Sequence, residues 1–170
     1  MSNAAQAVRD HLSSDPQARG LVFVSLFMYG AEIAKALDCD FYSTHAPTSD
    51  LALERMHQRW IAGEKRVMVC TSAFGAGTDY SHVQLVVHVG TSFNIIDYMQ
   101  EAGRGGRDRQ HAMCILIPTL PIAVEEKRNT YDALVSGGCI RHLITSMTDH
   151  TGMYCGDDSQ NKLCSHCTAK

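Results

Sequence analysis

No run of this sequence reaches the roughly 20 apolar residues that a membrane-spanning helix needs, and Met1–Leu12 is too polar for a signal peptide. We therefore expect an intracellular protein with no membrane partner. The sequence also lacks a large excess of either charge, because it has 15 Lys and Arg and 18 Asp and Glu. A net charge of −3 argues against a polybasic nucleic-acid arm but is compatible with a local basic site.

Two motifs that handle nucleotide phosphates are also absent. The 170 residues contain no G-x-x-x-x-G-K-[ST] phosphate loop and no D-E-x-H box for Mg²⁺. Without a loop to hold the β- and γ-phosphates and the metal, we expect negligible nucleotide hydrolysis by this chain alone. The near-average composition, with 45% hydrophobic and 19% charged residues, excludes collagenous, coiled-coil and wholly disordered chains.

Between residues 20 and 121, apolar runs of strand length alternate with segments of helical period. The strand-like runs suit strands that are buried on both faces. Ser49 or Asp50 can cap a helix over Asp50–Ile61, and Gly63 can end it. Gly103 can end a helix over Asn94–Ala102. This alternation predicts an α/β fold with a mostly parallel sheet between helices. The predicted strands are Leu21–Leu26, Val67–Cys70, Gln84–Val89 and Ala112–Ile117, and the predicted helices are Ala31–Leu37, Asp50–Ile61 and Asn94–Ala102.

The two ends of the chain have a different character. Residues 1–19 predict a short helix followed by a Ser-Ser-Asp-Pro linker. Ile122–Ser136 and Cys139–Met147 have helical patterns, and Gly137-Gly138 separates them. Thr148–Lys170 is polar and too poor in apolar residues to form a core, so another factor must order it.

Four of the seven cysteines lie in the last 32 residues, and two of them form a C-x-x-C pair. In a reducing compartment this arrangement predicts a tetrahedral Zn²⁺ site rather than disulfides. Zinc would also supply the folding energy that the polar C-terminal segment lacks. The other cysteines and His88 have apolar neighbours, so we expect them in the core. The candidate zinc ligands are Cys139, Cys155, Cys164 and Cys167, and the candidate core cysteines are Cys39, Cys70 and Cys114.

Three arginines fall within six residues in the segment Gln100–Arg109, directly after a short amphipathic helix and beside three glycines. The planar guanidinium binds phosphate oxygens in pairs and never loses its charge. Glycine ends the helix and lets a large anion approach the backbone. A solvated basic turn is the alternative, and the Q-x-x-G-R-x-G-R spacing favours an anion site.

The segment Gln100–Arg109 resembles motif VI of superfamily 2 helicases, in the form found in the RecQ family. Cys70–Asp79 resembles motif V, and Leu21–Leu26 stands where the motif IV strand would be. The GRGGR variant is similar to that of a fungal branch of RecQ-like proteins. The resemblance implies a RecA-like second motor domain over 20–121. It places a linker and helix over 1–19, and a helical extension with a zinc-binding subdomain over 122–170.

The resemblance also implies roles for individual residues. Arg104 and Arg107 would reach the ATP phosphates across a cleft, and Gln100 would link nucleotide state to domain closure. Asp79, with Gly77 beside it, would contact the nucleotide at the ribose, although a turn or cap role for Asp79 remains open.

Nucleic-acid contacts are implied at two further places. Thr71 and Ser72 would touch the DNA backbone, and helix or turn capping is an equally strong interpretation. His45 stands where the family often has a Tyr-His-x-Gly element, and it either faces nucleic acid or is a loop histidine without a role.

RecQ-family proteins carry a four-cysteine zinc subdomain after motif VI, which the four C-terminal cysteines resemble. The gap between Cys155 and Cys164 is wider than the familiar pattern. His142, His150 or His166 could therefore replace one cysteine.

The resemblance implies the second motor half of an ATP-dependent 3′–5′ DNA helicase that acts in DNA recombination and repair in the nucleus. ATP with Mg²⁺ would be shared with a P-loop-bearing first domain, in cis or in trans. The DNA partner would be single strands and duplex junctions. Two alternatives remain: a non-catalytic, zinc-stapled module that binds DNA or protein, and an α/β domain whose arginine loop binds another phosphate.

Overall fold

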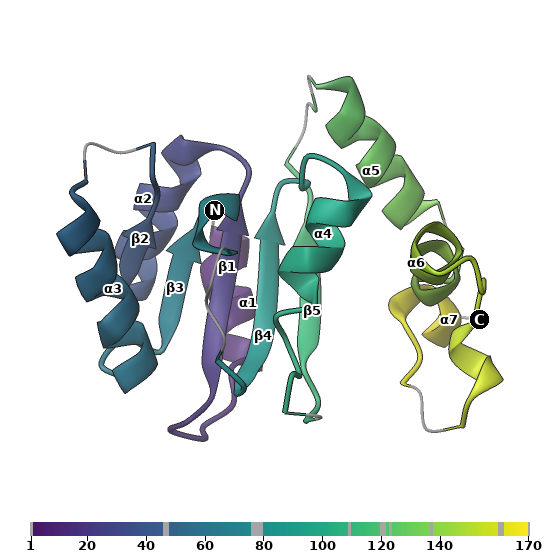
Figure 1. Ribbon diagram of the computed structural model, residues 1–170, viewed down its shortest axis with the longest axis horizontal. Coiled ribbons are helices and arrows are strands. Elements are labelled where there is room, and N and C mark those ends of the chain that lie inside the picture. The colour runs from purple at the N-terminus through teal and green to yellow at the C-terminus, as the bar shows by residue number, and fades with distance from the viewer. Residues whose placement is uncertain are drawn as a thin grey trace. The chain divides into compact units, whose positions relative to one another are not determined.

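The computed structural model describes residues 2–45, 48–75, 80–108, 110–119, 122, 124–136, 138–159 and 162–169. The chain divides into two compact units, Met1–Pro121 and Ile122–Lys170 (Figure 1). The first unit contains a parallel five-stranded sheet with helices on both faces. The predicted α/β fold is therefore confirmed.

The sheet has the strand order β2-β3-β1-β4-β5, and every neighbouring pair is parallel. All residues of β1 and β3 are buried, as continuous apolar runs predict. The sequence analysis missed β2, because a three-residue strand shows no clear period. The strands are β1 (Arg19–Val24), β2 (Asp40–Tyr42), β3 (Val67–Cys70), β4 (Val83–Val89) and β5 (Met113–Ile117).

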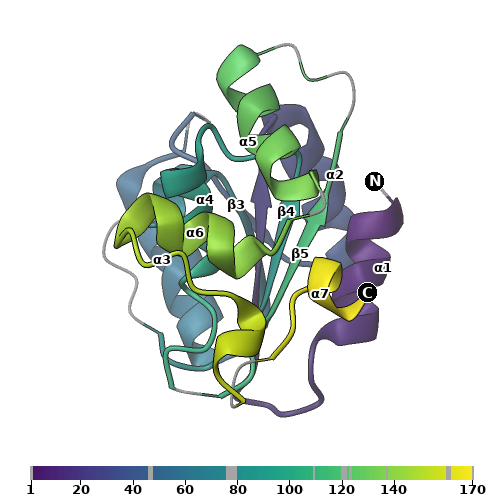
Figure 2. The ribbon, with the colours of Figure 1, turned by 90° about the vertical axis from the view of Figure 1, so that its right-hand side faces the viewer.

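Helices cover both faces of the sheet, as the view in Figure 2 shows. On one face, α1 (Ser2–His11) and α2 (Phe27–Leu37) contribute Val8 and Ile33 to a core with alternate residues of the strands. On the other face lie α3 (Asp50–Ala62) and α4 (Ile95–Ala102). The helix predicted within 1–19 thus packs directly on the sheet.

Capping residues determine where α3 and α4 begin and end. The Ser49 side chain accepts a hydrogen bond from Ala52 N, and Asn94 Oδ1 accepts one from Asp97 N at 2.9 Å. Gly63 ends α3 with a φ of 83°, a left-handed conformation that favours glycine. Ser49 and Gly63 act as the sequence predicts, and Gly103 directly follows α4.

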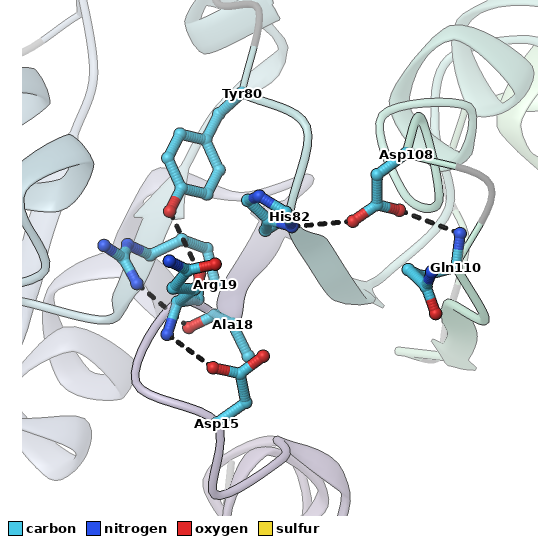
Figure 3. Close-up of polar contacts among 8 residues, drawn as sticks. Asp15, Ala18, Arg19, Tyr80, His82, Asp108 and Gln110 are labelled. Atoms are coloured by element: carbon cyan, nitrogen blue, oxygen red, sulfur yellow. Dashed lines mark hydrogen bonds and ion pairs between the residues drawn. The ribbon is translucent and has the colours of Figure 1, made fainter.

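Trp60 is the centre of the core beneath α3 and is fully buried. Its Nε1 donates to Gly20 O at 3.3 Å, and its ring meets those of Phe74 and Tyr80 at centroid distances of 5.6 and 5.3 Å. The buried Arg19 guanidinium donates to Trp60 O at 2.7 Å. It lies 5.0 Å from the Tyr80 ring, and both side chains are drawn in Figure 3. These contacts join α3 to the start of β1.

The second unit is small and contains three helices and a 3₁₀ turn in its described residues. They are α5 (Glu125–Val135), α6 (Ile140–Thr148), the turn Cys155–Asp157 and α7 (Ser165–Thr168). Only a few of the described side chains in this unit are buried, among them Leu134, Cys139 and Cys155. Across the described part of the chain, no helix has the length and apolar character to cross a bilayer.

The predicted core cysteines have different outcomes. Cys70 is fully buried and Cys39 is half-buried. The prediction was wrong for Cys114, which is exposed because it lies on β5, the last strand of the sheet. His88 is buried in β4, as predicted.

We expect Trp60→Ala to lower the free energy of unfolding by about 3–5 kcal/mol, because it removes the largest side chain of this core. Denaturant unfolding followed by circular dichroism measures the change. Leu51→Ala on the same helix is the control, since Leu51 is 61% exposed and its loss should cost no more than about 0.5 kcal/mol. Equal effects of the two substitutions would contradict this description of the core.

Candidate functional site

The segment Gly103–Asp108, which we call the arginine loop, follows α4 without a break. Gly103 N donates to Met99 O at 2.7 Å, and Gly105 N donates to Ala102 O at 3.1 Å, so the chain turns tightly out of the helix. The loop then returns to the sheet, where Gly106 N donates to Val83 O at 3.0 Å. Arg104 and Arg107 extend from this turn.

Two glycines allow the arginine loop to lie this close to the strands. A Cβ on Gly105 would come within 2.9 Å of the Ala112 Cβ. Gly106 has a φ of +72°, and a Cβ there would lie 2.9 Å from Gln110 O. The glycines beside the arginines therefore have a structural reason, namely close packing of the loop on β4 and β5.

Asp108 holds the far end of the arginine loop (Figure 3). Its Oδ2 lies 2.8 Å from His82 Nδ1, and its Oδ1 accepts a hydrogen bond from Gln110 N at 2.9 Å. His82 directly precedes β4, so this contact and the Gly106–Val83 bond attach the loop to the start of one strand. Sequence reasoning did not identify His82 or Asp108.

Arg104 is half-buried, whereas Arg107 and Gln100 are exposed. Burial lowers the pKa of the Arg104 guanidinium most, and the positive charge of Arg107 lowers the same pKa further. Cys70 and Glu101 act in the opposite direction. The two guanidinium groups are thus close enough to repel each other, and a bound polyanion such as a phosphate would relieve that repulsion.

The candidate DNA contacts follow the carboxyl ends of β2 and β3, which are neighbours in the sheet. His45 and Ser72 are exposed there. Thr71 is half-buried, and its hydroxyl oxygen is buried without a hydrogen-bond partner among the described residues. Thr71 O, not its hydroxyl, accepts from Phe74 N at 3.1 Å in the 3₁₀ helix Ser72–Gly75.

Two other candidates, Gly77 and Asp79, lie outside the described residues. Their implied contacts with the nucleotide remain predictions from the resemblance. The same holds for the roles of Gln100, Arg104 and Arg107 at the nucleotide.

In the second unit the structure gathers four sulfur atoms within 4.8 Å of one another, those of Cys139, Cys155, Cys164 and Cys167. Tetrahedral zinc with Zn–S bonds of about 2.3 Å places its sulfurs about 3.8 Å apart, so the cluster has a suitable size. Cys139 and Cys155 are buried, with their Sγ atoms 3.5 Å apart.

The charges of these thiols also fit a cation. Burial opposes ionisation of Cys139, but hydrogen bonds from the His142 and Cys155 backbone and from neighbouring thiols lower its pKa to about 6. The pKa of Cys167 is raised to about 12, first by its hydrogen bond to Cys139 and then by burial and the Cys164 thiolate. Four thiolates cannot coexist here without a positive ion, which Zn²⁺ would supply.

The three histidines considered as substitute ligands have other contacts. His142 Nδ1 lies 2.6 Å from Gly152 O, His150 Nδ1 lies 3.1 Å from Ser146 O, and His166 Nε2 lies 2.9 Å from Leu134 O. Among the residues that can be described, the metal-ligand cluster consists of cysteines alone.

Comparison with known proteins agrees with this geometry. Residues 3–109 match the model of the helicase conserved C-terminal domain. The chain is 31% identical over 119 residues to the ATP-dependent DNA helicase RecQ of Synechocystis and 32% identical over 127 residues to the mouse ATP-dependent DNA helicase Q1. These alignments cover 68% and 66% of this chain but 25% and 19% of the relatives, so the chain spans a quarter or less of their length.

Solved structures show the same fold at lower identity. The chain is similar to the E. coli DEAD-box protein SrmB, with 19% identity and a TM-score of 0.56 over 69% of this chain and 68% of that one. The C-terminal domain of the DEAD-box protein Dbp5 matches with 15% identity and a TM-score of 0.59 over 79% of this chain and 76% of that one. The family-model match over residues 3–109 and the RecQ relatives above show that the chain belongs to the helicase C-terminal domain family, within its RecQ-like branch.

Proposed function

We propose that this chain is the second motor half of an ATP-dependent 3′–5′ DNA helicase and supplies arginines to a nucleotide held by a P-loop-bearing domain. The proposal rests on the presence of Arg104 and Arg107 on one short loop. The two groups are close enough that the positive charge of Arg107 lowers the pKa of Arg104. The loop is attached to β4 through Gly106 and Asp108, so it can present both groups in a defined position.

In this proposal the first domain binds ATP and Mg²⁺, and the arginines of this chain stabilise charge that develops on the transferred phosphoryl group. A preorganised guanidinium in such a position raises hydrolysis by about 10³–10⁵ in related phosphoryl-transfer systems. Gln100, exposed in the last turn of α4, would sense the nucleotide as the domains close. Asp79 and Gly77 would contact its ribose side.

We expect Arg104→Ala to reduce DNA-stimulated ATP hydrolysis by about 10³-fold when the chain is combined with a P-loop-bearing first domain of the same organism. Arg104→Lys should recover only part of the rate, because an ammonium cannot bind two phosphate oxygens as a fork. The control is Arg9→Ala, since Arg9 lies on α1, on the opposite face of the sheet from α4, and donates to Ala36 O. Unchanged hydrolysis in Arg104→Ala would refute the assignment of this loop.

DNA is the proposed partner of the edge that carries His45, Thr71 and Ser72. Ser72 is exposed and can donate to a phosphate directly, whereas the buried Thr71 hydroxyl would have to turn outward first. This edge lies beyond the carboxyl ends of β2 and β3, where parallel sheets commonly bind ligands.

We expect Ser72→Ala to weaken binding of a single-stranded oligonucleotide about fivefold, the loss of one hydrogen bond worth about 1 kcal/mol. Fluorescence anisotropy at several salt concentrations measures this, and the affinity should fall steeply with salt. Ser14→Ala is the matched control, because Ser14 is exposed before the amino end of β1, at the opposite edge. Equal affinities of both variants would remove Ser72 from the DNA contacts. If DNA affinity does not change with nucleotide, and adding the P-loop-bearing first domain restores no ATP hydrolysis, the non-catalytic DNA-binding module is favoured instead.

We also propose that the four cysteines hold a structural Zn²⁺ that orders the second unit. The resident metal would act as a staple, since the described residues of this unit bury few apolar side chains. Reduced cysteines of this kind are typical of intracellular proteins, which is compatible with the proposed nuclear location.

We expect one zinc per chain by metal analysis, and chelation should melt the second unit while the far larger core of the first unit keeps its circular dichroism. Cys164→Ser should lose the metal. His166→Asn should keep it, because His166 contacts Leu134 O rather than the sulfur cluster. Zinc loss in His166→Asn with retention in Cys164→Ser would show that a histidine replaces that cysteine.

A further inference from the structure

A carboxylate is buried in the last turn of α4, directly before the arginine loop, although the proposed mechanism gives it no task. Glu101 lies on the apolar face of α4, one turn after Tyr98, and is 8% exposed. The Ser92 hydroxyl donates to Glu101 Oε2 at 2.5 Å, and His88 Nε2 lies 3.1 Å from the same oxygen. A Glu at a helix position that otherwise buries Ile95 and Tyr98 is the sequence signal that could have indicated this group.

The partners of Glu101 are themselves held in place. His88 is 1% exposed within β4, and its ring packs against Phe23 at 5.5 Å and Tyr98 at 4.8 Å between centroids. Ser92 is buried in the segment between β4 and α4. A buried carboxylate is costly unless it is hydrogen-bonded, and the Ser92 hydroxyl supplies such a bond. The close approach to His88 places the last turn of α4 against β4.

Arg104 lies three residues after Glu101, directly beyond the last turn of α4. Its backbone N donates to Glu101 O at 3.3 Å, so the two residues share the final turn. The Glu101 carboxylate supports the charge of Arg104, whereas burial and Arg107 oppose it. Cys70, at the end of β3, also acts on Arg104 and lies close to Glu101. Glu101 is therefore one of the groups that favour the charged form of the half-buried Arg104.

We propose that Glu101 is a positioning residue, whose buried carboxylate, anchored by Ser92 and His88, fixes the end of α4 and orients Arg104. This inference rests on the proposed role of Arg104 at the nucleotide. A guanidinium held in place before the reaction needs no reorganisation when charge develops. Glu101 itself touches neither the nucleotide nor the reacting atoms in this scheme.

The first test is a double-mutant cycle on single-turnover ATP hydrolysis with the P-loop-bearing first domain. Glu101→Gln keeps the shape of the side chain but removes its charge, and it should lower the rate about tenfold with little change in KM. In an Arg104→Ala background the same substitution should change the rate by no more than about twofold. Glu32→Gln, an exposed residue on α2, controls for loss of a negative charge.

This double-mutant cycle distinguishes the positioning role of Glu101 from the proposed role of Arg104 at the nucleotide. Additive effects of Glu101→Gln and Arg104→Ala would overturn the positioning role while leaving the role of Arg104 intact. A full rate in Arg104→Ala alone would instead overturn the proposed function.

The second test uses the present chain alone and does not depend on hydrolysis. Arg104 Nε is buried, so its proton should exchange slowly with water, and the rate can be followed by ¹⁵N NMR. Glu101→Gln should speed this exchange about tenfold. Arg19 Nε–H, which donates to Trp60 O at 2.7 Å, is the internal control and should not change. Equal exchange of Arg104 in both proteins would overturn the proposal, and faster exchange at both arginines would show general destabilisation instead.

Discussion

The attachment of α4 and the arginine loop to strand β4 is the constraint on which the candidate nucleotide site depends. Four contacts make this attachment: Glu101 to Ser92, Glu101 to His88, Gly106 to Val83, and Asp108 to His82. Each joins the helix or loop to β4 or to the residues beside it. Because β4 is buried between two neighbouring strands, the loop inherits the rigidity of the sheet.

Electrostatics gives this arrangement its chemical character. The loop brings two guanidinium groups together, and burial further disfavours the charge on one of them. Cys70 and the Glu101 carboxylate offset part of that cost. A protein with a net charge of −3 can therefore present a strongly basic site at one place. The net charge of the whole chain therefore does not predict the charge of the arginine loop.

The two units obtain their stability in different ways. The first buries apolar residues on both faces of a sheet, with Trp60 at the centre of one core. The second buries few of its described side chains, and its four C-terminal cysteines meet in a cluster that fits a metal ion. In a segment this poor in apolar residues, bonds to a metal can replace hydrophobic burial as the source of folding energy.

Much of the fold was determined locally, by the apolar runs of β1, β3 and β4, the caps of α3 and α4, and the GRGGR spacing. These signals are visible in sequence because burial and helical period act over a few neighbouring residues. Only the tertiary structure decided that Asp108 meets His82, that Glu101 is buried against His88, and that Cys114 is exposed. Those outcomes depend on strand order and on which strand lies at the edge, and such long-range pairings leave no periodic trace along the chain.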